Sequence, residues 1–482
     1  MKYLGNVITD NDISSWGACL KNSGSCKILI SSHTGSGKSH FIKNKLSESF
    51  SGKILLITNR KILRQQVKAE LEQSGNENIS TINYQGLELI SQSKDNLFSG
   101  YDIVVFDEAH YLFSDSVFNR NTDLLLNFLK SPPKNKICIF MSATPDIILY
   151  YCKDFDFMYS LEDDYSYIDK LCFFSREESY DEILSSVAEG EKCLCFCSSA
   201  REAYEKSLKY KDSAFICSEN NKKYYSNSSI EERQNLINYG KFNCKILFTT
   251  KVLDNGVNIK DEDLKNIIID TSDPITFIQC LGRKRILNDK DKVNLYVKNY
   301  SGRSLAAISI KFSEKLKLVS ELKEIGKSEF IKRYRKKNFD DIIDNDITIN
   351  EAKYYNYKYY QNLYYNMRCD EDGKGYIKYI CERLKINLKN IFILEEEFEK
   401  DNIQLLINEY YGKKIYPEEQ DNFKNEFFGC ILVPKKTDYR KRGIRSINGV
   451  LKELGFNFVL KSKVSSVDKQ SFRYWCLELM ES

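Results

Sequence analysis

Short apolar segments alternate with helix-like segments from residue 27 to residue 298, and this alternation constrains the fold more than any other feature. Short β-branched segments between amphipathic stretches are typical of a parallel sheet that is covered by helices. Two such series occur, one before and one after residues 150–169. The sequence therefore predicts two α/β domains in tandem, with strands at residues 27–31, 53–58, 103–106, 137–141, 193–197, 246–249, 267–270 and 293–297.

The composition argues against several classes of protein. The chain has 482 residues, enough for roughly three or four domains, and it is 42% hydrophobic and 29% charged. No apolar run reaches about 18 residues, and residues 1–12 lack a signal pattern, so we expect a cytoplasmic protein with no membrane partner. The cysteines include no CxxC pair, so we expect reduced thiols and no zinc site. The net charge of +4 neither requires nor excludes a nucleic-acid partner.

A glycine-rich segment, Ser32-His-Thr-Gly-Ser-Gly-Lys-Ser39, lies between the first predicted strand and a predicted helix at 41–46. In this context glycines let the backbone N–H groups face a phosphate, and the helix N-terminus adds partial positive charge. Lys38 can reach the β- and γ-phosphates of ATP, and Ser39 can bind Mg²⁺. The expected ATP-binding residues here are Thr34, Gly35, Ser36, Gly37, Lys38 and Ser39.

A second segment, Tyr101-Asp-Ile-Val-Val-Phe-Asp-Glu-Ala-His110, is a predicted buried strand that ends in two carboxylates. Mg²⁺ prefers carboxylate oxygens and water as ligands, so Asp107 is the expected metal ligand. Glu108 can orient and deprotonate the attacking water. An acidic turn after a buried strand is common by itself, but its position after a phosphate loop favours a nucleotide-hydrolysis site.

Asp107-Glu-Ala-His110 resembles the DEAH box of superfamily 2 helicases, and further motifs of that family follow in the family's order. Met141-Ser-Ala-Thr-Pro145 resembles the element that links ATP state to domain motion. Gln279-Cys-Leu-Gly-Arg283 resembles motif VI, whose arginine reaches the γ-phosphate across the domain interface. The resemblance covers residues 25–300 and implies two RecA-like motor domains, at 1–155 and 156–300.

The resemblance also implies roles for single residues. It implies catalytic roles for Lys38, Glu108, Gln279 and Arg283, and a nucleotide contact for Gly256 of motif V. Coupling roles are implied for His110, Ser142 and Thr144, and nucleic-acid backbone contacts for Arg60, Thr81, Ser198 and Thr250. The family often has a second arginine where this chain has Ile286, so we expect Arg285 to act in its place. The sequence lacks a glutamine-containing adenine motif before Ser32, which argues against the DEAD-box RNA branch.

The pattern changes after residue 300. Residues 301–419 read as a helical domain with a dense run of tyrosines, for which helix packing is favoured over base stacking. Residues 420–482 are rich in Lys and Arg, and a helix followed by two alternating segments resembles a winged-helix module. Arg445, Asn448 and Lys452 share one face of that helix and are expected to contact DNA. A basic module of this kind can also bind a protein partner.

Taken together, these features predict an ATP- and Mg²⁺-dependent superfamily 2 helicase that unwinds or remodels single-stranded or forked DNA. A role in phage or mobile-element replication, repair or recombination fits the resemblance of motif VI to that of viral and phage replication helicases. Two alternatives remain open at this point. One is an RNA helicase. The other is an ATP-switched nucleic-acid-binding or loading protein, including an anti-phage defence component, that does not separate strands.

Overall fold

The computed structural model describes residues 3–33, 35–58, 78–93, 97–117, 119, 121–251, 257–334, 342–344, 346–433, 435–467 and 470–480. Contacts divide the chain into two compact units. Unit 1 comprises Met1–Asp169 and Val187–Leu388, and unit 2 comprises Lys170–Ser186 and Lys389–Ser482. No helix in the described part of the chain is long and apolar enough to cross a membrane.

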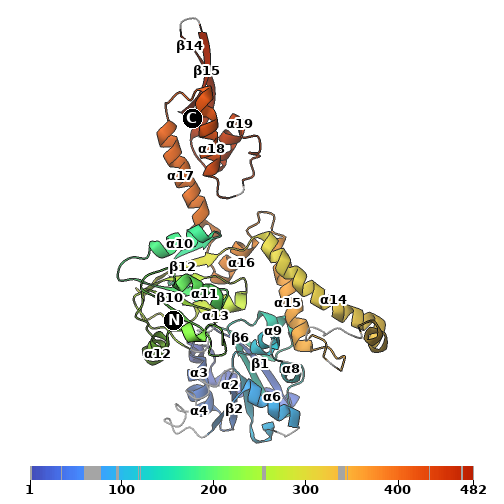
Figure 1. Cartoon of the computed structure of the whole chain (residues 1–482). Helices are drawn as coiled ribbons and strands as arrows, with labels where there is room; N and C mark the ends of the chain where they lie inside the picture. Colours follow the sequence, from blue (N-terminus) through green and yellow to red (C-terminus); the bar gives the residue numbers. More distant parts are fainter. Residues whose placement is uncertain are drawn as a thin grey trace. The chain divides into compact units, whose positions relative to one another are not determined.

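The first of the two predicted motor domains lies in unit 1 and is built on a parallel sheet with strand order β3-β2-β4-β5-β1-β6, drawn in blue to teal in Figure 1. The four inner strands, β2, β4, β5 and β1, are buried along almost their whole length, which explains why they read as continuous apolar runs. The strands are β1 (Cys26–Ser31), β2 (Ile54–Thr58), β3 (Ile79–Asn83), β4 (Ile103–Phe106), β5 (Ile137–Ser142) and β6 (Phe157–Ser160).

Helices surround this sheet and supply the rest of its core, in which Trp16 and Phe41 are fully buried. Most of them are short, and the helix after the phosphate loop widens into a π-helix at Phe41–Leu46. The helices are α1 (Leu4–Val7), α2 (Asp10–Ser23), α3 (Lys38–His40), α4 (Ser47–Ser49), α6 (Tyr84–Ser93), α7 (Tyr111–Ser114), α8 (Thr122–Lys130) and α9 (Asp146–Tyr151).

The second predicted motor domain has a parallel sheet of its own. Five of its strands belong to unit 1, and they follow the order β12-β11-β8-β10-β9. Helix α13 (Pro274–Leu281) follows β11 and begins with Asp273 as its N-cap and Pro274 in its first turn. The other elements are β8 (Lys192–Phe196), β9 (Ser213–Ile216), β10 (Ile246–Thr249), β11 (Leu264–Ile269), β12 (Val293–Lys298), α11 (Ala200–Ser207) and α12 (Ile230–Tyr239). Two parallel α/β domains in tandem, the predicted fold class, are therefore confirmed.

A helical segment completes unit 1. It consists of α14 (Gly302–Arg333), α15 (Glu351–Arg368) and α16 (Gly375–Leu384), of which α14 is broken by a non-helical residue at Gly326. Helices α14 and α15 pack against each other, and the rings of Tyr357, Tyr360 and Tyr364 lie against Phe312 of α14. All three tyrosines are buried, in agreement with the packing role that the sequence favoured.

Unit 2 contains the C-terminal part of the chain. Its core gathers Ile447 and Val450 of α19 with Trp475 and Leu477 of the terminal hairpin. The elements are β7 (Ile168–Phe174), α10 (Glu177–Ser185), β13 (Ile391–Ile393), α17 (Leu394–Tyr410), α18 (Pro417–Gly429), α19 (Ile444–Glu453), β14 (Phe458–Val467) and β15 (Gln470–Leu479). The predicted helix and hairpin are present, whereas nothing confirms a winged-helix domain as such. The contact division at residue 388 places α17 in unit 2, where it packs with α18 and β15.

Candidate active site

The phosphate loop follows β1 and is held between two other segments. Ser32 N–H donates to the carbonyl of Ser142 at 3.0 Å, so the loop starts beside the end of β5. Gly35 and Gly37 adopt φ values of 90° and 83°, which strain any residue with a Cβ. Leu4 N–H donates to the carbonyl of Ser36 at 3.0 Å. This N-terminal support of the loop was not predicted, because nothing in the residues of the first turn signals it.

Lys38, at the start of α3, is the central cation of the site. Its ammonium lies 3.2 Å from the carbonyl oxygen of Ser32 and 3.2 Å from Glu108 Oε1. Glu108 has a φ of 51°, a left-handed conformation that is uncommon outside glycine and is typical of functional sites. The structure therefore brings together Lys38 and Glu108, two residues predicted to be catalytic, from two strand ends that are 70 positions apart in the chain.

The two adjacent carboxylates have opposite electrostatic environments. Burial, reinforced by the neighbouring Glu108, raises the pKa of Asp107 to about 6. Burial also disfavours ionisation of Glu108, but Lys38, His110 and Arg283 outweigh it and lower the pKa of Glu108 to about 2. A divalent cation beside Asp107 would favour its ionised form, whereas Glu108 is ionised at neutral pH without one.

His110 joins the acidic segment to the residues that follow β5. Its Nδ1 lies 3.0 Å from Ser142 Oγ and 3.5 Å from Glu108 Oε2. Ser142 Oγ in turn accepts the N–H of Thr144 at 3.0 Å. The three residues predicted to couple ATP state to motion thus form one buried chain with the predicted general base.

A residue of the second motor domain completes this chain. Gln279 on α13 places its Nε2 2.7 Å from His110 Nε2, so Gln279 contacts the coupling histidine. Arg283, just beyond α13, is close enough to lower the pKa of Glu108. Arg285 donates to Asn258 Oδ1 at 2.8 Å, and its guanidinium would clash with a Cβ added at Gly35. Burial and Arg283 lower the pKa of Arg285 to about 10, which still leaves it cationic at neutral pH.

The residues around the loop fit a nucleoside triphosphate with Mg²⁺. The hydroxyls of Ser32 and Ser36 are buried, and in the described part of the chain they have no hydrogen-bond partner. An open hollow of about 720 Å³ borders the loop at Gly35, and the rings of Tyr3, Tyr165 and Tyr167 line it. Unsatisfied buried hydroxyls, a glycine cradle and one ammonium form a donor set for phosphate. Asp107, which is buried, and Ser39, which is exposed on α3, are the residues that can hold Mg²⁺.

The predicted nucleic-acid contacts in the motor domains differ in exposure. Ser198 is exposed just after β8, and its hydroxyl donates to Glu202 at 2.6 Å. Thr81 is half-buried on β3, and Thr250 is buried after β10. The predicted residues Thr34, Arg60 and Gly256 lie outside the described residues.

In unit 2, the structure corrects one of the three predicted helix contacts. Arg445 and Lys452 are exposed on α19, as a contact with a partner requires. Asn448 instead donates its amide to the carbonyl of Leu460 at 3.0 Å and accepts the Leu460 N–H at 2.7 Å. Its amide is therefore committed to the backbone of β14, and Asn448 holds the hairpin on the helix rather than reading a groove.

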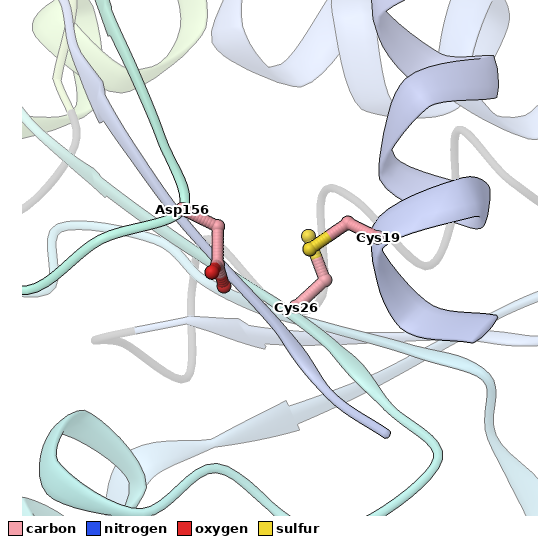
Figure 2. Close-up of side chains that lie close together, drawn as sticks. All are labelled: Cys19, Cys26 and Asp156. Atoms are coloured by element: carbon pink, nitrogen blue, oxygen red, sulfur yellow. The ribbon is translucent and has the colours of Figure 1, made fainter. Parts of the chain in front are cut away.

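Two thiols and a carboxylate gather at the start of β1, at the opposite end of that strand from the phosphate loop. The ligand atoms of Cys19, Cys26 and Asp156 lie within 4.8 Å of one another, and Figure 2 shows the three side chains grouped beside helix α2. One oxygen of Asp156 already accepts the N–H of Lys27 at 2.7 Å. Structural zinc sites use four protein ligands, and this group offers three in the part of the chain that the structure describes, so we assign it no metal.

The fold and the site together define a class: a two-domain phosphate-loop nucleotide hydrolase whose second domain contacts the hydrolysis site. Comparison with protein-family models narrows this class. Residues 82–149 match the DEAD/DEAH box helicase domain, and residues 175–285 match the helicase conserved C-terminal domain. The two matched segments are helicase domains, which fits a superfamily 2 helicase, and together they indicate an ATP-hydrolysing nucleic-acid helicase.

Other comparisons add relatives of low similarity. No curated protein matches the chain. Among solved structures, Dbp5 of S. cerevisiae bound to RNA and ADP BeF3 is 17% identical over 59% of this chain and 82% of its own, with a TM-score of 0.42. The DEAH/RHA helicase HrpB of Escherichia coli is 15% identical over 61% of this chain and 42% of its own, with a TM-score of 0.41. A fragment of a putative HsdR subunit of a type I restriction enzyme from Vibrio vulnificus is 18% identical over 60% of this chain and 63% of its own, with a TM-score of 0.39.

Proposed function

We propose that this helicase acts on DNA, single-stranded or forked, and uses ATP to move along it or to remodel it. The observation that carries the ATP-driven part is the path from Lys38 through Glu108 and His110 to Gln279, which joins the nucleotide site to the second motor domain. The basic residues Arg445 and Lys452, exposed on α19 beside an antiparallel hairpin, favour DNA. Such a motor serves replication, repair or recombination.

The chemical step follows from an exchange of partners at Lys38. Without nucleotide, the Lys38 ammonium is paired with Glu108. When the phosphates of ATP lie on the loop, Lys38 turns to them and releases the Glu108 carboxylate, which then accepts a proton from the attacking water. Asp107 and Ser39 are the residues that would hold Mg²⁺, which would neutralise phosphate charge when bound. Arg283 adds positive charge from the second motor domain where charge develops on the phosphoryl group.

The coupling step uses His110. Its ring lies between Ser142 Oγ in the first motor domain and Gln279 Nε2 in the second. A change at Glu108 therefore reaches both domains through one buried side chain. We infer that ATP binding closes the domains and that hydrolysis opens them, while Thr81 and Ser198 hold the nucleic-acid backbone. Backbone contacts of this kind carry little sequence information.

The test is steady-state ATP hydrolysis by the purified full chain with no nucleic acid, single-stranded DNA, forked DNA or single-stranded RNA. Lys38→Ala and Glu108→Gln serve as inactive controls. The proposal predicts stimulation by DNA that both substitutions abolish. Stimulation by RNA alone would replace DNA with RNA as the substrate. Stimulation by DNA without displacement of any duplex strand would favour an ATP-switched clamp instead.

A further inference from the structure

Helix α15 is attached to the first motor domain at its N-terminal end. The N–H of Ala352 donates to Asp123 Oδ1 on α8 at 2.9 Å. Glu351 pairs with Lys130, at the other end of α8, at 2.6 Å. Both contacts hold the first turn of α15 against α8.

The middle of α15 lies against α9, the helix that follows the coupling residues Ser142 and Thr144. The rings of Tyr355 and Tyr151 meet edge to face, with centroids 4.7 Å apart. Asn362 Nδ2 donates to the hydroxyl of Tyr150 at 3.0 Å. Helix α15 therefore touches the first motor domain next to the segment that senses the nucleotide.

The same helix also contacts the second motor domain through tyrosine hydroxyls. The hydroxyl of Tyr360 donates to Asp273 Oδ1 at 2.8 Å, and that of Tyr364 donates to the carbonyl of Ser272 at 3.1 Å. Asp273 is the N-cap of α13, where its carboxylate also accepts the N–H groups of Ile275 and Thr276. One carboxylate thus joins α15 to the first turn of the helix that carries Gln279.

The Tyr360 side chain is well placed to hold this position. Its ring is buried and stacks on Phe312 of α14, with centroids 5.9 Å apart and planes 16° from parallel. Burial and the neighbouring Asp273 raise the pKa of Tyr360 well above its ordinary value, so the hydroxyl remains a donor at any physiological pH. Because the ring of Tyr360 is held in place and its hydroxyl always carries a proton, Asp273 has one well-defined hydrogen-bond donor on α15.

We propose that Tyr360 is a positioning residue for ATP hydrolysis, acting through Asp273 on helix α13. The hydroxyl holds the N-terminus of α13, and the helix then presents Gln279 to His110 and leads into Arg283. Because α15 is anchored on α8 and α9 as well, closure of the motor domains over ATP depends on the helical segment between them. This inference rests on the proposed function, because it needs ATP hydrolysis and the contacts that join Glu108 to Gln279 through His110.

The test is the variant Tyr360→Phe, which removes the hydroxyl and keeps the ring that packs on Phe312. We expect nucleic-acid-stimulated kcat to fall about tenfold while KM for ATP stays within about twofold, since the phosphate loop is untouched. Tyr334→Phe is the matched control, because Tyr334 on the same helical segment also donates its hydroxyl to a carboxylate, that of Glu321 at 2.5 Å. The control should keep the wild-type kcat.

A double-mutant cycle shows whether Tyr360 acts through Asp273. Asp273→Asn preserves a capping side chain but changes the acceptor for the phenol. The double variant should lose no more kcat than the more impaired single variant. The inference would be overturned if the kcat losses of the two single variants added up in the double variant, or if Tyr360→Phe kept the wild-type kcat. It would also be overturned if the kcat loss were fully explained by a smaller fraction of folded protein.

Amide hydrogen exchange gives a readout that does not need turnover. In Tyr360→Phe the amides of Ile275 and Thr276 should exchange about tenfold faster than in wild type or in Tyr334→Phe. Unchanged exchange at these amides would also overturn the inference. Failure of the proposed DNA activity can be distinguished from failure of this inference. In the first case, DNA does not stimulate ATP hydrolysis by the wild-type protein.

Discussion

Replacing the buried carboxylate of Asp107 should stabilise the protein while abolishing its activity. The pKa of Asp107 is about 6 in the fold, against about 3.9 in an unfolded chain. Two pKa units at about 1.36 kcal/mol each give a cost of about 3 kcal/mol for ionised Asp107 in the folded, Mg²⁺-free protein. Asp107→Asn removes this cost, because the amide does not ionise.

The pH dependence follows from the sign of the shift. A carboxyl whose pKa is raised by folding costs nothing below the unfolded pKa, and its cost is complete above the folded pKa. Asp107→Asn should therefore be more stable than wild type at pH 8, and the difference should vanish by about pH 4. Mg²⁺ with a non-hydrolysable ATP analogue should stabilise the wild type and not the variant.

Denaturant unfolding followed by tryptophan fluorescence is the assay. The chain has two tryptophans, Trp16 in the core of the first motor domain and Trp475 in unit 2. In a Trp475→Phe background, Trp16 reports the first motor domain alone. Asp154→Asn, at an exposed aspartate of the same domain, has the same change in charge and serves as the control. No gain in stability at pH 8, or an equal gain at pH 4, would refute the reasoning.

Three further predictions concern other contacts. Gln279→Ala removes the contact with the coupling histidine, and nucleic-acid-stimulated kcat for ATP hydrolysis should fall at least about tenfold while KM for ATP stays within about twofold. Gly35→Ala places a Cβ at a φ of 90° and against a guanidinium, so ATP binding measured by calorimetry should weaken, whereas Gly17→Ala on α2 should bind normally. Asn448→Ala removes two hydrogen bonds to the backbone of Leu460, so the free energy of unfolding of unit 2 should fall by about 2 kcal/mol, measured by the fluorescence of Trp475.

Most of the strands that the sequence predicted are buried on both faces. Strands β1, β4 and β5 consist almost entirely of buried apolar residues, so each reads as an apolar run. Strands β3, β6 and β9 were missed, because they lie at sheet edges and alternate or mix buried with exposed residues. A four- or five-residue segment of that kind cannot be separated from a loop by periodicity.

The local parts of the site were predictable because each lies in one short motif. Lys38 follows a glycine-rich loop, and Glu108 ends a buried strand, so residue type and context are sufficient. Contacts between distant residues were not predictable. The pair of Gln279 and His110 spans 169 positions, and its distance depends on how the two domains pack. Asn448 had the spacing of an exposed helix face, but the packing of β14 against α19 decides which backbone it meets.

Strand displacement from a forked DNA duplex tests the central claim most directly. Wild-type protein with ATP and Mg²⁺ should release a labelled strand, and Lys38→Ala should release none. Gln279→Ala, which keeps the phosphate loop intact, should release much less than wild type. Wild-type protein that hydrolyses ATP on forked DNA but releases no strand would contradict the account, as would release by Lys38→Ala equal to that of wild type.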